Sequence, residues 1–334
     1  MCSSQIISIF RGGNYNVMGK LEQYSSLEEK RNHFKSHRIV RTKDELVQLI
    51  DLFKKLSNQH KQKYLFRGVN ESKFKLYSSF QRLWIQRELS EIGLDYKERI
   101  SSMIDRCKRK DCLLYRYFRR LGVVVNDWLV LSFLQHYGAA SPLLDFSKQY
   151  EIALFFACDN VKYTLSDNEI DNYISIYYYK TVDVANDVAP SIYKLAKNIA
   201  ANKTALERKN FWSEISFDKV MKNKETVIVP SYASQSKISN NRGTYISTYT
   251  IANLNSTAQE GEFVCNATPD KPLEMLWINN RKQYLHCVDI HKGLVEYIIK
   301  SIMPGASIES ARRHYYPMEN DIADKAQHEI LYDI

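Results

Sequence analysis

The sequence has few of the residues that build linkers and turns. Its 334 residues include only 11 glycines and 7 prolines, so long flexible linkers are not expected. Hydrophobic residues make up 44% and charged residues 25%, which is ordinary globular usage and excludes wholesale disorder. A domain usually comprises roughly 100–200 residues, so length alone indicates one large domain or two.

Signals for secretion, membranes and common metal sites are also missing. None of the six cysteines forms a C-x-x-C pair, so no metal is expected, and scattered cysteines in a large chain are typical of free thiols in a reducing compartment. No apolar stretch approaches the roughly 18 residues that span a bilayer, and the first residues lack the features of a signal peptide. We therefore expect a cytoplasmic protein without a membrane partner, and the oligomeric state stays open.

The sequence lacks the standard catalytic motifs. It contains no Walker loop, no G-x-G-x-x-G, no H-E-x-x-H and no G-x-S-x-G. Ser132, His136 and Asp145 have the residue types of a hydrolase triad, but no nucleophile elbow or oxyanion loop accompanies them. These routes to an enzyme assignment are closed.

What the chain has is positive charge and tyrosine. The net charge is +9, which favours an anionic partner such as a nucleotide, a phosphate or a nucleic acid. A solvated lysine-rich surface explains the same charge equally well. The 23 tyrosines suit both cores and clefts, and they can stack on bases.

The hydrophobic pattern predicts helices early and strands late. A capping box at Thr42-Lys43-Asp44-Glu45 begins a helix over 42–58, and residues 1–40 before it are expected to be an N-terminal extension. Amphipathic helices are predicted from 79 to 120 with a break near Gly93, and another from 126 to 137 that Gly138 ends. Further expected strands lie at 64–66, 173–179, 226–229 (closed by Pro230), 262–265 and 284–290, and 141–146 is expected to be a turn with a short extended piece. Helices are expected at 190–212 and 291–303, and a loop with short strand pieces at 233–258. This order favours an α+β fold with a mixed or antiparallel sheet and a large helical insertion in the first half.

Arg67 and Gly68 are the first candidates for chemistry. They follow a short apolar strand, where an arginine can bind a phosphate or carboxylate and a glycine allows close approach. An arginine that only pairs with a carboxylate such as Asp145 is an equally good interpretation.

Two further candidates lie at helix ends. His136 lies at a predicted helix C-terminus, where the dipole favours its protonated form, and it can contact a ligand or simply cap the helix. Ser147 follows Asp145 and can cap the helix that carries Ile152 and Phe155, or contact an anion at that helix N-terminus. Capping alone explains Ser147 adequately.

Gln259 and Glu260 lie far along the chain, where a polar loop meets the strand at 262–265. A carboxylate or amide there can accept a ribose hydroxyl or stabilise a developing cation. Exposed glutamates in a turn are the commoner case.

Four segments together resemble the FRG domain family: Phe66-Arg67-Gly68, Gln135-His136-Tyr137-Gly138, Leu143-Leu144-Asp145-Phe146 and Ala153-Leu154-Phe155-Phe156-Ala157. The middle motif of that family commonly reads Q-H-Y-G-x-P-T-R-L-L-D-W-T, whereas this chain has Ser141-Pro142 in place of T-R and Phe146-Ser147 in place of W-T. A late Q-x-G-x-F element matches at Gln259, Gly261 and Phe263. The resemblance covers residues 42–330, which we expect to form the domain.

The resemblance implies a bacterial or phage-encoded protein acting in defence or toxicity, and a distant similarity to ADP-ribosyltransferases. On that analogy NAD is the substrate, Arg67 holds its phosphates and Ser147 orients a ribose, with Gly68, His136 and Asp145 completing the cofactor site. Gln259 and Glu260 are then the catalytic candidates. The alternative is a non-catalytic module of a phage-defence system that binds nucleic acid or another anion. A purely structural role is the third interpretation.

Overall fold

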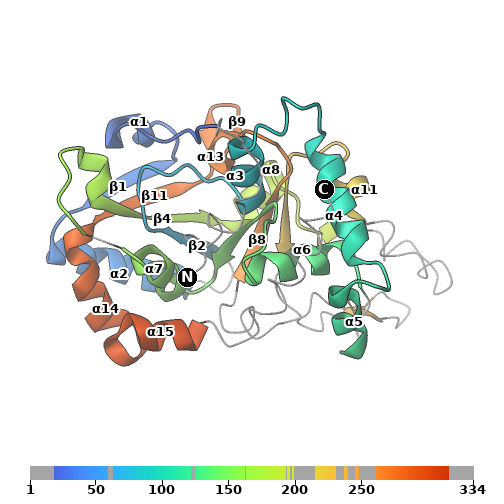
Figure 1. The fold of residues 1–334 in the computed structure, drawn as a ribbon. Helices are drawn as coiled ribbons and strands as arrows, with labels where there is room; N and C mark the ends of the chain where they lie inside the picture. The colour runs from blue at the N-terminus through green and yellow to red at the C-terminus, as the bar shows by residue number, and fades with distance from the viewer. Residues whose placement is uncertain are drawn as a thin grey trace.

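The computed structural model describes residues 19–58, 63–121, 125–161, 163–192, 194–195, 198, 215–230, 237–239, 245–247 and 261–315. Its centre is a seven-stranded sheet with the strand order β1-β11-β4-β2-β3-β8-β5 (Figure 1). β1 and β11 are parallel, and every other neighbouring pair is antiparallel. The strands are β1 (Ser36–Val40), β2 (Tyr64–Val69), β3 (Leu143–Ser147), β4 (Tyr173–Lys180), β5 (Thr226–Pro230), β8 (Gly261–Asn266) and β11 (His286–His291). The predicted α+β fold with a mixed sheet is confirmed.

Both faces of the sheet are covered, as the side chains of β4 show. Alternation along a strand places Ile174, Ile176 and Tyr178 on one face and Tyr177 and Tyr179 on the other. All five side chains are buried, in two different apolar clusters. β4 therefore reads as a nearly continuous apolar run, which is the pattern of a strand buried on two sides.

Four helices cover the face of Ile176: α2 (Lys43–Ser57), α7 (Tyr150–Cys158), α14 (Val295–Ile302) and α15 (Ile308–Tyr315). They lie together beneath the sheet in Figure 1. α2 begins as the sequence predicts, because Thr42 and Glu45 form both bonds of the capping box. α7 begins at Tyr150, three residues after Ser147, so the prediction that Ser147 is its N-cap is wrong.

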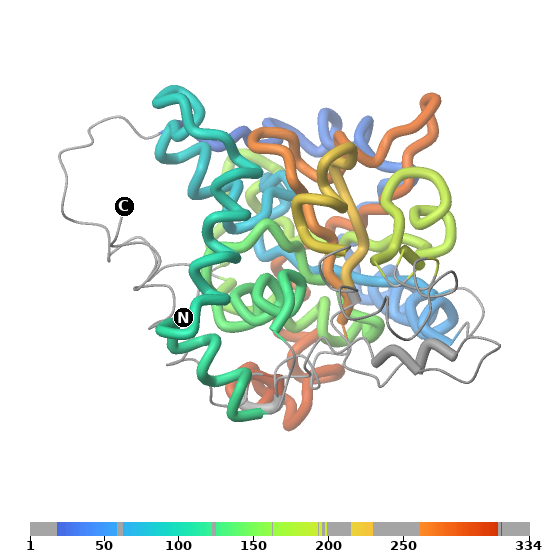
Figure 2. Tube along the Cα trace, turned by 90° about the vertical axis from the view of Figure 1, so that its right-hand side faces the viewer, coloured from blue at the N-terminus to red at the C-terminus, as the bar shows by residue number. Residues whose placement is uncertain are grey.

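The predicted helical insertion is present between β2 and β3. It consists of α3 (Ser79–Gln86), α4 (Tyr96–Cys107), α5 (Leu113–Arg120) and α6 (Asp127–His136), which pack on the β3-β8-β5 end of the sheet. Gly93 between α3 and α4 and Gly138 after α6 have φ angles of 77° and 80°. A positive φ suits glycine, so both breaks fall where the sequence predicts them. Figure 2 shows α4 and α5 along one side of the molecule.

Residues 19–40 are part of the fold. β1 pairs with β11 over five residues, and Lys30 of α1 (Leu27–Arg31) is completely buried. The structure shows no separation at the predicted boundary near residue 40, since residues 19–40 supply both a strand of the sheet and a buried side chain. This segment has no strong hydrophobic period, because a short edge strand has a mixed burial pattern.

The remaining elements are short. The expected helix at 190–212 and loop at 233–258 fall largely outside the described residues, as do Gln259 and Glu260. In the part of the chain that the structure describes, no helix is long and apolar enough to cross a bilayer. The short elements are α8 (Thr181–Asp187), α11 (Phe217–Met221), α13 (Leu273–Leu276), the 3-10 helices Glu169–Asn172, Lys292–Leu294 and Pro304–Ala306, and the strand pairs β6 (Lys237–Ser239) with β7 (Tyr245–Ser247) and β9 (Ile278–Asn279) with β10 (Lys282–Gln283).

Candidate functional site

Gly68 is fixed by the packing of α7 on β2. A Cβ atom at Gly68 would lie 1.8 Å from the carbonyl oxygen of Ala153 and 2.7 Å from the amide nitrogen of Ala157. The helix backbone therefore fills the space beside Gly68, and the two small residues of α7 permit this approach. Packing alone therefore accounts for this glycine, and its role beside a ligand stays a prediction.

Arg67 spans the point where two central strands separate. β2 and β3 pair only at Phe66 and Ser147, whereas β2 pairs with β4 along its whole length. From Arg67 onward β2 has no backbone pairing with β3, and the Arg67 guanidinium bonds β3 there instead. Its Nη1 donates to the Asp145 carbonyl oxygen at 2.9 Å and to Asp145 Oδ2 at 3.3 Å. The side chains of Arg67 and Asp145 stay 17% and 32% exposed, so solvent reaches this pair.

Gln135, the last residue but one of α6, joins this pair. Its Nε2 donates to Asp145 Oδ2 at 3.1 Å. Three buried polar atoms of the group have no hydrogen-bond partner among the described residues: Arg67 Nε, Gln135 Oε1 and Asp145 Oδ1. Buried polar atoms are nearly always bonded, so one unused donor and two unused acceptors here indicate a place for a polar molecule.

Arg82 of α3 adds a second positive charge. The Arg82 side chain is exposed along part of its length, but desolvation of its guanidinium and the nearby charge of Arg67 lower the pKa of Arg82 to about 10, against the opposing effect of Asp145. It is still protonated at neutral pH, and its Nη1 donates to the carbonyl oxygen of Tyr77 at 3.0 Å. Two guanidiniums near one carboxylate leave the group with a net positive charge, which favours an anionic ligand.

His136 is buried beside this group. Its ring packs edge-on against Phe263, with 4.9 Å between ring centroids. Burial lowers the pKa of His136 to about 4, and the charge of Asp145 offsets this only in part. The expectation that the helix dipole keeps His136 protonated is therefore wrong, since desolvation of a buried imidazolium outweighs the dipole.

Ser147 of β3 has a role in the turn that follows its strand. Ser147 is 5% exposed, and its Oγ accepts a bond from the amide of Gln149, so it shapes the turn into α7. Gln259 and Glu260 are outside the described residues. Gly261, which follows them, is the partner of Ser147 in the β3–β8 pairing.

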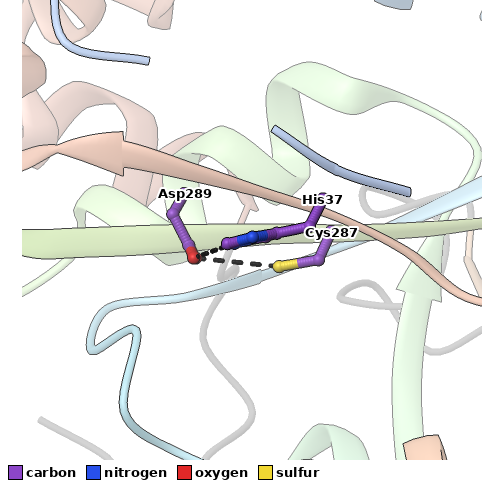
Figure 3. Close-up of side chains that lie close together, drawn as sticks. All are labelled: His37, Cys287 and Asp289. Atoms are coloured by element: carbon purple, nitrogen blue, oxygen red, sulfur yellow. Dashed lines mark hydrogen bonds and ion pairs between the residues drawn. The ribbon is translucent and has the colours of Figure 1, made fainter. Parts of the chain in front are cut away.

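A second polar cluster contains the residue types of a metal site. His37, Cys287 and Asp289 point toward one another across β1 and β11 (Figure 3). The His37 Nε2 lies 2.6 Å from Asp289 Oδ2, but Lys30 Nζ lies 2.6 Å from Asp289 Oδ1 and also bonds Ser72 and Ser175. The ammonium group already holds the place that a cation would take. We interpret this cluster as a buried ion pair between Lys30 and Asp289, which stabilises the contact of α1 with the sheet.

The segments that carry Arg67, Gln135 and Asp145 all lie within one family match. Residues 62–164 match the family model of the FRG domain. The chain carries an FRG domain. No curated protein and no solved structure matches the chain. The FRG domain match includes Arg67, Arg82, Gln135 and Asp145, so the whole polar group lies inside it. The wider range 42–330 stays a prediction.

Two members of the group were missed as site residues. Gln135 belongs to the Gln135-His136-Tyr137-Gly138 signature of the FRG domain, so its motif was a usable signal. Arg82 lies on an amphipathic helix with no motif around it, and nothing in the sequence separates it from other surface arginines. Its role depends on the fold of the FRG domain, which brings α3 near the ends of β2 and β3.

Proposed function

We propose that the FRG domain binds a nucleotide at the group formed by Arg67, Arg82, Gln135 and Asp145, and that NAD is the first ligand to test. One observation carries the proposal: Arg67 Nε, Gln135 Oε1 and Asp145 Oδ1 are buried and lack hydrogen-bond partners among the described residues. A ligand that fits must offer an acceptor to the guanidinium and N–H or O–H donors to the two oxygens.

A nucleotide has both kinds of group. Its phosphate oxygens suit the two guanidiniums, because arginine binds phosphate with paired, charge-assisted bonds. Its ribose hydroxyls, or the carboxamide of nicotinamide, can donate to Gln135 Oε1 and Asp145 Oδ1. An anion without N–H or O–H donors, such as sulfate, would satisfy only the positive side of this group. The mixture of donors and acceptors therefore favours a nucleotide over a simple anion.

We extend the proposal to ADP-ribosyl transfer, with Gln259 and Glu260 as the catalytic candidates. The support is the order of the motifs and the pairing of Gly261 with Ser147, two residues from Asp145. In this reaction the bond between the ribose C1′ and nicotinamide breaks, and nicotinamide leaves with the electron pair. The acceptor then bonds to C1′ and gives its proton to Glu260. A role in bacterial defence or toxicity rests on the family resemblance alone.

Isothermal titration with NAD, ADP-ribose and ATP tests the binding step. We expect binding by the wild type, and at least a tenfold loss, about 1.4 kcal/mol, for Arg67→Gln and for Gln135→Met. Arg41→Gln is the matched control, because Arg41 is an exposed arginine in an ion pair with Glu169. Absence of binding by the folded wild type would refute the proposal, and so would equal affinity for all variants.

Release of nicotinamide from NAD tests the transfer step separately. Glu260→Gln is expected to keep NAD affinity and to lose turnover. If NAD binds and no nicotinamide is released by the wild type with any protein or nucleic-acid acceptor supplied, the transferase extension is wrong and the binding proposal stands.

A further inference from the structure

The positive charge of the chain is concentrated on one corner of the helical insertion. Residues 108–120 contain six cationic side chains and one carboxylate, a net charge of +5 out of +9 for the whole chain. We infer that this corner binds the phosphate backbone of a nucleic acid. We call it the α4–α5 surface and define it by Lys108, Arg109, Lys110, Arg116, Arg119 and Arg120. It uses no residue of the Arg67 group and is independent of the proposed nucleotide site.

The charge is segregated along the insertion. The preceding segment, residues 88–98, has the opposite character, with four carboxylates and one lysine. A merely solvated surface needs only interspersed charges of both signs. Segregation creates a field of one sign, which raises the local concentration of an oppositely charged partner.

Most cations of the α4–α5 surface have no carboxylate partner among the residues that the structure describes. Arg109 pairs with Asp111 and Lys108 with Asp127. In the described part of the chain, Lys110, Arg116, Arg119 and Arg120 form no ion pair, and all four are exposed. Arg116 and Arg120 are four residues apart on α5, where like charges destabilise a helix. This arrangement costs stability in the free protein, and bound phosphates would relieve the repulsion.

The construction of α5 favours nucleic acid over a membrane. Its apolar residues Leu114 and Phe118 are fully buried in the protein core. An amphipathic helix binds lipid by inserting its apolar face, and this face is not available. Four of the six cations are arginines, whose planar guanidinium suits phosphate. Tyr115 is partly exposed among them and can stack on a base.

The position of the surface agrees with a long partner. α4 and α5 lie along the side of the molecule opposite α2 and α14, at its outer edge (Figure 1). A backbone that follows this edge meets cations from the end of α4, the connecting turn and both turns of α5.

Fluorescence anisotropy with labelled single-stranded and duplex DNA and RNA of about 20 nucleotides tests the inference, at about 50 and about 200 mM salt. The test variant is Arg116→Gln, Arg119→Gln and Arg120→Gln together. The matched control is Lys35→Gln, Lys54→Gln and Lys55→Gln, which removes the same charge from exposed positions on other elements. Thermal melts of both variants verify folding.

We expect the wild type to bind at least one of these nucleic acids, and to bind more weakly at the higher salt. The test variant should lose at least tenfold in affinity, with a salt slope smaller by about 2, since each lost phosphate contact removes roughly 0.7–0.9 from the slope. NAD titration should be unchanged in this variant. Equal losses in both triple variants would overturn the inference, as would no binding by the wild type. Binding to vesicles with anionic lipid, but to no nucleic acid, would assign the surface to a membrane instead.

Discussion

At the residue scale, Gly68 shows that a glycine in a signature motif can be required by packing alone. The carbonyl oxygen of Ala153 lies where a Cβ atom would be, so no side chain fits without moving α7 away from β2. The FRG signature therefore includes both partners of this contact, Gly68 on the strand and Ala153 with Ala157 on the helix.

We predict that Gly68→Ala destabilises the protein by about 3 kcal/mol or more, the upper end for overpacking of a rigid contact. Chemical denaturation followed by circular dichroism measures the change. Gly93→Ala is a useful control, because Gly93 has open space around its Cβ position and only a strained φ. A Gly68→Ala protein as stable as the wild type would show that α7 can shift freely.

His136 gives a pH dependence. The pKa of His136 is about 4 in the folded protein against 6.5 in the unfolded chain, so the unfolded state binds more protons between these values. The His136 contribution to stability is full above pH 6.5 and is lost as the pH falls toward 4. The total loss is about 3 kcal/mol.

Denaturation of the wild type and of His136→Asn between pH 7 and pH 4.5 checks this. The variant should lose less stability over the range, whatever its absolute stability. Part of the dependence should remain, because burial also lowers the pKa of His286 to about 4. Identical slopes for the two proteins would contradict the assignment.

Prediction from sequence was most successful where a local pattern decides the structure. The capping box at Thr42, the break at Gly93 and the apolar run of β4 each depend on neighbouring residues, and each was predicted. The partners of Arg67 were found in part, since the pairing with Asp145 was one of the two open interpretations. Arg82 and the protonation of His136 depend on distant elements and on burial, which spacing along the chain does not encode.

At the scale of elements, the contact of α1 and β1 with the sheet depends on one buried ion pair. Burial alone would lower the pKa of Lys30, but the charge of Asp289 outweighs it and raises the pKa. The pKa of Asp289 is lowered, since Lys30 and His37 outweigh the effect of burial. Both groups are therefore charged at neutral pH inside the protein.

We predict that Lys30→Met destabilises the fold by about 3–5 kcal/mol, because it leaves the buried carboxylate of Asp289 without the ammonium group that balances its charge. Lys300→Met, which breaks an exposed pair with Glu296, should change stability by no more than about 1 kcal/mol.

Thermal melts of the wild type with and without EDTA test for a bound metal. A lower melting temperature of the wild type in EDTA would show that His37, Cys287 and Asp289 hold a metal after all.

At the scale of the whole molecule, the matched segment 62–164 is not a self-contained unit. It supplies β2 and β3, but the other sheet neighbours of these strands, β4 and β8, lie beyond residue 164. The helices α2, α14 and α15 that cover the face of α7 are also outside it.

We predict that residues 62–164 expressed alone do not fold. Without β4 and β8 the segment leaves two strands with open edges and the apolar faces of α6 and α7 exposed. Amide NMR spectra should show collapsed dispersion, whereas the full chain should give a dispersed spectrum. A cooperative melt of the isolated segment would show that the match marks an independent domain.

The single pairing of Phe66 with Ser147 separates the sheet into two ladders of strands. β1, β11, β4 and β2 form one continuous ladder, and β3, β8 and β5 form another. At the junction between these two ladders, β2 and β3 share one residue pair, and the Arg67 guanidinium adds a hydrogen bond to the Asp145 carbonyl oxygen. Among the described strands of the sheet, this junction therefore has the fewest paired residues, and Arg67, which would hold a ligand, also bonds across it.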